Sequence, residues 1–187
     1  MACILRVTGG GERLITVAMS KVIRSPRARV WRALVSPREL IRWDERRISL
    51  EAPIPDYPAL GHSARWRCSL GSLTVEHCED PLEVIPAERL RFAVRLASFE
   101  FEETYTLADH APDATRLSLR LIAKNTLPLL GGELDRFDVR RLSAERVDQT
   151  LAQLQRWCEA PATASSDVQR LGDPALRVRE PRAVERR

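Results

Sequence analysis

The sequence lacks any apolar run close to the roughly 20 residues that a membrane-spanning helix requires. Its first residues contain only a short apolar patch before Arg6, which is too short for the core of a signal peptide. The sequence therefore predicts a cytoplasmic protein without stable insertion in a membrane.

Cysteine and histidine are few and scattered. The cysteines form no Cys-x-x-Cys pair, and the histidines do not supply the paired ligands of a zinc site. The cysteines are predicted to be small buried side chains rather than a disulfide framework. We expect no metal and no cofactor from this set, which is Cys3, Cys68, Cys78, Cys158, His62, His77 and His110.

Lysine is nearly absent, since Lys21 and Lys124 are the only two. The net charge of +4 is small against 30 basic and 26 acidic side chains, which alternate along the chain. Proteins that bind nucleic acids gather their basic residues on one face or stripe. The absence of such a stripe predicts that nucleic acid is not a partner.

The length of 187 residues indicates one domain with additional end segments. Residues 1–13 are predicted to be a flexible leader, because their Thr-Gly-Gly-Gly-Glu stretch lacks the ending of a phosphate loop. Residues 160–187 are poor in large apolar side chains and rich in Arg and Pro, which predicts a disordered basic tail. The domain between them, 14–159, is expected to be a monomer or a homodimer.

Residues 14–23 form a β-branched apolar run, which predicts a strand. The steps Ser25-Pro26 and Ser36-Pro37 follow it. Serine is a good helix N-cap, and proline tolerates the first helical position because its missing N–H would be unpaired there. Each step therefore predicts the start of a short helix, capped by its serine.

From Gly61 onward, apolar residues alternate with polar ones on strand after strand, and Pro81 is expected at a bulge or an edge. Apolar residues at helical spacing predict a long helix from Glu133 to Glu159 that covers the apolar face. The connecting loop 125–132 is unusually apolar, as at a binding mouth. The prediction is an α+β fold with a seven-stranded curved antiparallel sheet.

A specific pattern runs through residues 23–43: Ile23, Ser25, Pro26, Val30, Trp31, Ala33, Leu34, Ser36, Pro37, Leu40 and Trp43. With the order of elements, it resembles the SRPBCC or START-like helix-grip superfamily. That superfamily includes lipid-transfer domains, pollen-allergen-like proteins, aromatic polyketide cyclases and heat-shock-ATPase activators. The resemblance covers residues 14–159. It implies two short helices after the first strand and a long C-terminal helix over the concave sheet face.

The resemblance also implies a cavity between the sheet and the long helix. Inward residues of the strands, the apolar loop and the helix are then candidate walls for a ligand. These candidates are Trp66, Phe92, Phe101, Glu103, Tyr105, Leu119, Leu129, Leu130 and Leu151.

Glu103 is the exception on this face, because it alternates in phase with Phe101 and Tyr105. Burial would raise its pKa unless a cation or hydrogen-bond donors compensate, and such a group in a cavity is a functional candidate. Two alternatives remain open. A bulge could turn Glu103 toward water, or an arginine could pair with it.

His62 and His77 are weaker candidates for catalysis. Each lies in phase with apolar neighbours on its strand, and either could meet Glu103 as a carboxylate–imidazole pair for acid–base chemistry. A histidine near a strand end is more commonly a surface residue.

Three functions follow. The first is binding of a small hydrophobic or amphipathic molecule, such as a lipid, a polyketide or an aromatic metabolite. The second is a cyclase or dehydratase that uses Glu103 as acid or base in the cavity. The third is a protein-partner module like the heat-shock-ATPase activators.

Overall fold

The computed structural model describes residues 14–161 except 53, 55, 98, 125, 126, 130, 131 and 135, and of residues 124–137 it gives the backbone alone. The predicted leader 1–13 and nearly all of the predicted tail 160–187 lie outside this range. The elements are β1 Leu14–Ile23, α1 Arg27–Val35, α2 Pro37–Trp43, β2 Arg47–Leu50, β3 Ala64–Leu70, β4 Leu73–Ile85, β5 Arg89–Leu96, β6 Phe99–Ala111, β7 Ala114–Lys124, β8 Leu127–Leu129, β9 Gly132–Leu134 and α3 Arg136–Glu159.

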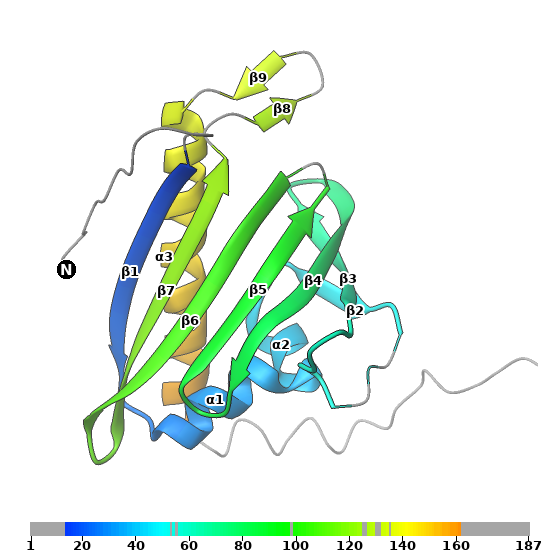
Figure 1. Cartoon of the computed structure of the whole chain (residues 1–187). Helices are drawn as coiled ribbons and strands as arrows, with labels where there is room; N and C mark the ends of the chain where they lie inside the picture. The colour runs from blue at the N-terminus through cyan, green and yellow to red at the C-terminus, as the bar shows by residue number, and fades with distance from the viewer. Residues whose placement is uncertain are drawn as a thin grey trace, which may run out of the picture.

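Seven strands form one curved antiparallel sheet in the order β1-β7-β6-β5-β4-β3-β2, as predicted (Figure 1). β1, the first strand of the chain, pairs with β7, whereas the strands from β2 to β7 pair in the order in which they follow one another along the chain. The ladder between β4 and β5 shifts register between Pro81 and Glu83, so the predicted bulge at Pro81 is confirmed. Proline donates no ladder hydrogen bond, which explains why it lies at this irregularity.

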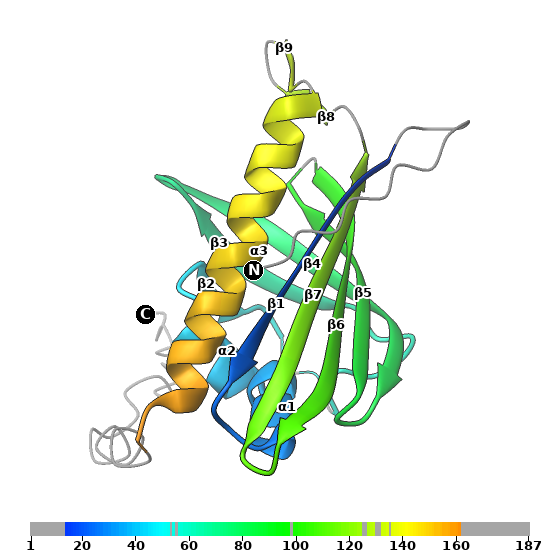
Figure 2. The same ribbon diagram turned by 90° about the vertical axis from the view of Figure 1, so that its left-hand side faces the viewer.

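α3 lies along the concave face of the sheet and contacts β1 and β7 (Figure 2). Its buried side chains recur every three or four residues, which places them on one face of the helix. They are Val139, Ser143, Val147, Leu151, Leu154 and Cys158, with Thr150 beside them. No helix in the described part of the chain is long and apolar enough to cross a membrane.

The start of α3 differs from the prediction. The helix begins at Arg136 rather than at Glu133, because Gly132–Leu134 pair with Leu127–Leu129 as the small β8–β9 sheet. The predicted apolar loop 125–132 therefore contains strand structure. The side chain of Leu129 and the whole of Leu130 lie outside the described residues, so their predicted ligand contacts stay predictions.

The two short helices follow β1 directly, as predicted. At α2, Ser36 accepts a hydrogen bond from the backbone N–H of Glu39 at 3.4 Å, and Pro37 takes the first helical position. The predicted Ser25 cap is wrong. α1 begins only at Arg27, so Pro26 occupies the cap position, and Ser25 is buried with its own N–H donating to the Ile23 carbonyl.

The two helices are joined by a buried hydrogen bond. The indole Nε1 of Trp43 donates to the backbone carbonyl of Ala33 at 2.9 Å. Ala33 lies in the last turn of α1, where carbonyl groups have no partner within the helix. Trp43 of α2 thus caps a free carbonyl group at the C-terminal end of α1 and holds the two helices together.

We predict that Trp43→Phe destabilises the protein by about 1–3 kcal/mol, because the buried Ala33 carbonyl loses its donor. Urea unfolding followed by circular dichroism measures this change. Trp31→Phe is the matched control, since the Trp31 indole makes no hydrogen bond to any described residue and should cost under about 1 kcal/mol. Equal losses in the two variants would contradict the role given to Trp43.

Candidate functional site

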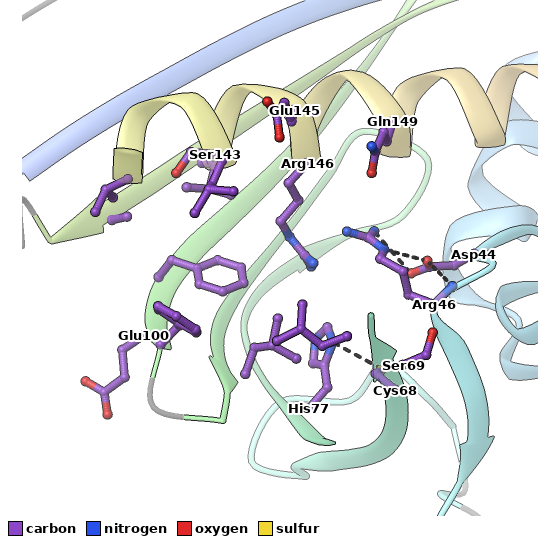
Figure 3. Close-up of a pocket in the computed structure, with 18 residues that line it drawn as sticks. Asp44, Arg46, Cys68, Ser69, His77, Glu100, Ser143, Glu145, Arg146 and Gln149 are labelled. Atoms are coloured by element: carbon purple, nitrogen blue, oxygen red, sulfur yellow. Dashed lines mark hydrogen bonds and ion pairs between the residues drawn. The ribbon is translucent and has the colours of Figure 1, made fainter. Parts of the chain in front are cut away.

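A pocket of about 250 Å³ lies between α3 and the concave face of the sheet, near the start of the helix (Figure 3). Most of its wall is apolar and comes from β5, β6, β7 and α3. The main apolar residues of the wall are Leu96, Phe99, Phe101, Leu121, Val139 and Leu142. Leu142 is 42% exposed, and the other exposed residues of the lining are Leu70, Glu100, Glu145 and Gln149, so the rim of the pocket is both apolar and polar.

Charged side chains gather at the inner end of the pocket. Arg146 reaches down from α3, and Arg46 approaches from the segment between α2 and β2 (Figure 3). Arg46 binds Asp44 through Nε at 2.9 Å and donates to Thr150 at 3.0 Å. Burial tends to raise the pKa of Asp44, but Arg46 and Arg47 lower it to about 2, so Asp44 is ionised at neutral pH.

Glu103 is buried at 1% exposure and points toward α3. It pairs with Phe92 and Leu121 in regular register, which excludes the bulge, and the arginine alternative is correct. Arg146 Nε donates to Oε1 of Glu103 at 2.7 Å, and the Tyr105 hydroxyl donates to Oε2 at 3.0 Å. Burial alone would raise the pKa of Glu103, but the charge and hydrogen bond of Arg146, together with weaker contributions from other positive charges such as Arg46, hold the pKa below its usual value.

A second buried carboxylate, Glu79 on β4, was missed by the sequence reasoning. Its carboxylate takes two guanidinium hydrogen bonds from Arg47, one of them at 3.2 Å, and one bond at 2.8 Å each from Trp66 Nε1 and the Tyr57 hydroxyl. Burial tends to raise the pKa of Glu79, yet Arg47 keeps it well below the usual range. The available signal was that Glu79 lies in phase with His77 on one strand.

His77 lines the pocket, and its ring lies between a thiol and a carboxylate. Nδ1 is 3.6 Å from Sγ of Cys68, and Nε2 is 3.3 Å from Oε1 of Glu79. The Nε2 contact lacks hydrogen-bond geometry, so this buried nitrogen has no hydrogen-bond partner within the described residues. Burial lowers the pKa of His77 and raises that of Cys68 to about 11, so both are uncharged at neutral pH.

The other predicted site residues separate into three groups. Phe101 lines the pocket, as His77 does. His62 is exposed on the approach to β3 and does not meet Glu103. The rest lie in the packed core, outside the pocket wall, and their contact with a ligand stays a prediction: Trp66, Phe92, Tyr105, Leu119 and Leu151.

Within the described ranges, no group of three His, Cys, Asp or Glu side chains is arranged to hold a metal ion. Each buried carboxylate of the site is instead held by arginine. The arrangement is suited to binding an organic molecule with an apolar body and a polar group at its inner end.

We predict that Glu79→Ala destabilises the protein by about 3–5 kcal/mol, because the buried Arg47 loses its main partner and keeps only Asp44, which it shares with Arg46. Glu83→Ala on the same strand should cost under about 1 kcal/mol, since its ion pair with Arg89 is partly exposed. The double variant Glu79→Met/Arg47→Met should recover much of the loss, because both charges are removed. Urea unfolding of the three variants tests this. A double variant that is no more stable than Glu79→Ala would contradict it.

The comparisons with solved structures identify the fold. The chain resembles the protein TTHA0849 from Thermus thermophilus at 25% identity and a TM-score of 0.62, over 81% of this chain and 99% of the other. A START superfamily protein from Mycobacterium smegmatis matches at 13% identity and 0.63, over 77% and 97%. The Zhui aromatase/cyclase from a Streptomyces species matches at 13% and 0.58, over 77% and 95%.

These neighbours confirm the helix-grip, START-like fold that the sequence pattern predicted. No protein with a curated description matches the chain in sequence. The family model described as "Activator of Hsp90 ATPase homolog 1-like protein" matches residues 24–159, which is most of the chain and includes both short helices, the pocket and α3. The chain therefore belongs to the family of Activator of Hsp90 ATPase homolog 1-like proteins.

Proposed function

We propose that the protein binds a small, largely apolar molecule in the pocket between the sheet and α3. The observation that carries this proposal is the pocket itself, which has apolar walls and a few polar groups gathered at its inner end. This division of lining is typical of small-molecule sites, where apolar walls supply affinity and polar groups fix orientation. The membership of the family and the START and aromatase/cyclase neighbours support ligand binding or cyclase-type chemistry in general.

The size of the pocket favours a compact ligand. Its 250 Å³ equals the liquid volume of about eight water molecules at roughly 30 Å³ each. Pockets for drug-sized ligands span about 300–1,000 Å³. Of the predicted classes, an aromatic metabolite with one or two fused rings fits this space better than a long-chain lipid. Three further points stay predictions. They are that the protein is cytoplasmic, that it is a monomer or a homodimer, and that it could act by binding a protein partner.

Filling the pocket should abolish binding. Ala123 lies on β7 in the pocket wall, so Ala123→Phe places a ring in the ligand space. We expect equilibrium dialysis to show methyl naphthyl ketone binding to the wild type and at least tenfold weaker binding to this variant, a difference of about 1.4 kcal/mol. Ser143→Phe fills the same space from α3 and should act alike.

The control for this experiment is Ala108→Phe, which adds the same ring at an exposed position of β6 outside the pocket wall. It should bind the ketone like the wild type. Native mass spectrometry of protein purified without denaturation would detect a molecule retained from the host. If both pocket-filling variants fold and still bind the ketone as tightly as the wild type, ligand binding in this pocket is contradicted.

The second candidate function is an enzyme that moves a proton in the same pocket. The observation that favours it is the series Cys68, His77 and Glu79, of which the first two reach the pocket wall. Nε2 of His77 lies next to the Glu79 carboxylate and Nδ1 lies next to the Cys68 thiol, so Nδ1 is the candidate nitrogen for the base. The neutral imidazole lies in the pocket wall and can accept a proton, whereas the Glu103 carboxylate lies outside the wall with its oxygens bonded to Arg146 and Tyr105. His77 is therefore better placed than Glu103 to act as the base.

This candidate predicts enolisation of a bound ketone. His77 Nδ1 would take a proton from the methyl carbon of methyl naphthyl ketone. The C–H electron pair would form the C=C bond of the enolate, and the C=O π pair would move onto the oxygen. In D₂O the returning deuteron labels the methyl group, and proton NMR measures the rate. The exchange should not slow as the pH falls past about 6.5, because the pKa of buried His77 lies below that ordinary value and the imidazole stays unprotonated.

His77→Gln should remove this exchange while the affinity for the ketone stays within about threefold, or 0.7 kcal/mol. His62→Gln is the matched control, because His62 is exposed outside the pocket. Exchange that survives in His77→Gln would show that another group is the base. Its loss in Glu103→Gln alone would return the role to that carboxylate.

A further inference from the structure

We propose that the two terminal nitrogens of Arg146 bind a carbonyl oxygen of the ligand, and that Glu103 makes the site prefer an uncharged ketone or aldehyde over a carboxylate. The inference rests on the proposed function, since it names the chemical class that the same pocket binds. It assigns Arg146 as a specificity-determining residue and Glu103 as the residue that positions and neutralises it.

Arg146 is held in place by contacts that leave its far end free. Its Nε donates to Glu103 at 2.7 Å, and its guanidinium carbon lies 4.9 Å from the centre of the Phe101 ring. Glu103 is in turn fixed by the Tyr105 hydroxyl. The arginine is thus anchored on the side of the sheet, and its orientation does not depend on a ligand.

The two terminal nitrogens of Arg146 are available as donors to a ligand, because no described residue accepts a hydrogen bond from them. The fully buried side-chain N and O atoms that lack a partner in this part of the chain are His77 Nε2 and Gln153 Oε1, so the Arg146 nitrogens reach open space. The side chain is 14% exposed and lines the pocket, and Figure 3 shows it pointing down from α3 among the lining residues. An oxygen acceptor in the pocket would complete their hydrogen bonding.

The charges around the pocket decide which acceptor fits. Glu103 neutralises Arg146, Asp44 neutralises Arg46, and His77 is uncharged at neutral pH. The acidic residues of the lining do not compensate a negative ligand either. Glu100 is exposed, and Glu145 pairs with the exposed Arg141 of the same helix.

A carboxylate ligand would therefore bring an uncompensated negative charge into an apolar space, which is costly. A carbonyl oxygen brings no charge and still receives a charge-assisted hydrogen bond from the guanidinium. The balance of charges is the reason why the ketone is preferred. The same balance explains the part of Glu103, because removing its charge would leave a net positive Arg146 in the pocket.

Three naphthalenes substituted at the same ring position test this, with equilibrium dialysis as the measurement. Methyl naphthyl ketone carries the carbonyl, isopropenyl naphthalene replaces the oxygen with a methylene group, and naphthoate carries the charge. The wild type should bind the ketone about tenfold tighter than the alkene, the size of one hydrogen bond to a charged donor. It should also bind the ketone tighter than naphthoate.

Two variants separate the roles. Glu103→Gln should strengthen naphthoate relative to the ketone by about tenfold, because it unmasks the charge of Arg146. Glu103→Gln/Arg146→Met removes both charges, so no buried charge is left alone, and it should bind ketone and alkene equally while keeping the wild-type affinity for the alkene. Arg156→Met, at a 67% exposed arginine of the same helix, is the control and should leave all three affinities unchanged.

The outcomes are distinct. Equal affinity of the wild type for ketone and alkene, with both binding, would overturn the role of Arg146 and leave the proposed binding function intact. Tightest binding of naphthoate to the wild type would overturn the preference assigned to Glu103. If none of the three naphthalenes binds, the proposed function and this inference are both overturned.

Discussion

Two carboxylates lie on the covered face of the sheet, and the cost of burying them shapes the rest of the structure. Glu79 and Glu103 are each 1% exposed, and each is held by an arginine from outside the strand that carries it. A buried ionised group is tolerated only when a partner charge and hydrogen bonds replace its water. Arg47 on β2 and Arg146 on α3 supply these, so charge as well as apolar contact holds the edge strand β2 to β4 and the helix α3 to the sheet.

These two pairs divide the space under α3. Around Glu79, the side chains of Arg47, Trp66 and Tyr57 close the interior, and the centre of the sheet is densely packed. Toward the start of α3 the packing opens into the pocket, whose inner end is formed by Arg146 and by Arg46 with Asp44. The charged side chains of the pocket therefore lie where the apolar core ends. Two of them, Arg146 and Arg46, also hold α3 in place through Glu103 and Thr150.

This arrangement connects the stability of the domain to its chemistry. Glu103 was the functional candidate in the sequence, yet in the structure it holds Arg146 and lies behind the wall, while the groups that reach the pocket are Arg146, Arg46 and His77. A buried carboxylate that fixes an arginine keeps that arginine oriented without a ligand, which would reduce the conformational cost of binding. In the proposed binding site, Glu103 would act through Arg146 rather than on a bound molecule.

The sequence by itself determined the fold and favoured a Glu103 that faces the helix, while the regular register of the sheet excluded the bulge that would have turned it outward. Alternation with period two fixes which side chains of a strand face the helix, and the residues from Ile23 to Trp43 carry local signals for two short helices. It could not assign Ser25 or the start of α3, because the end of a helix depends on neighbours such as β8 and β9. It gave no sign of Arg47 or Arg146 as partners of Glu79 and Glu103, which lie 32 and 43 residues away along the chain. Only the tertiary structure decided these pairs. The contact of Arg47 with Glu79 is set by the arrangement of β2, β3 and β4, and that of Arg146 with Glu103 by how α3 lies on the sheet, and no local pattern encodes either distance.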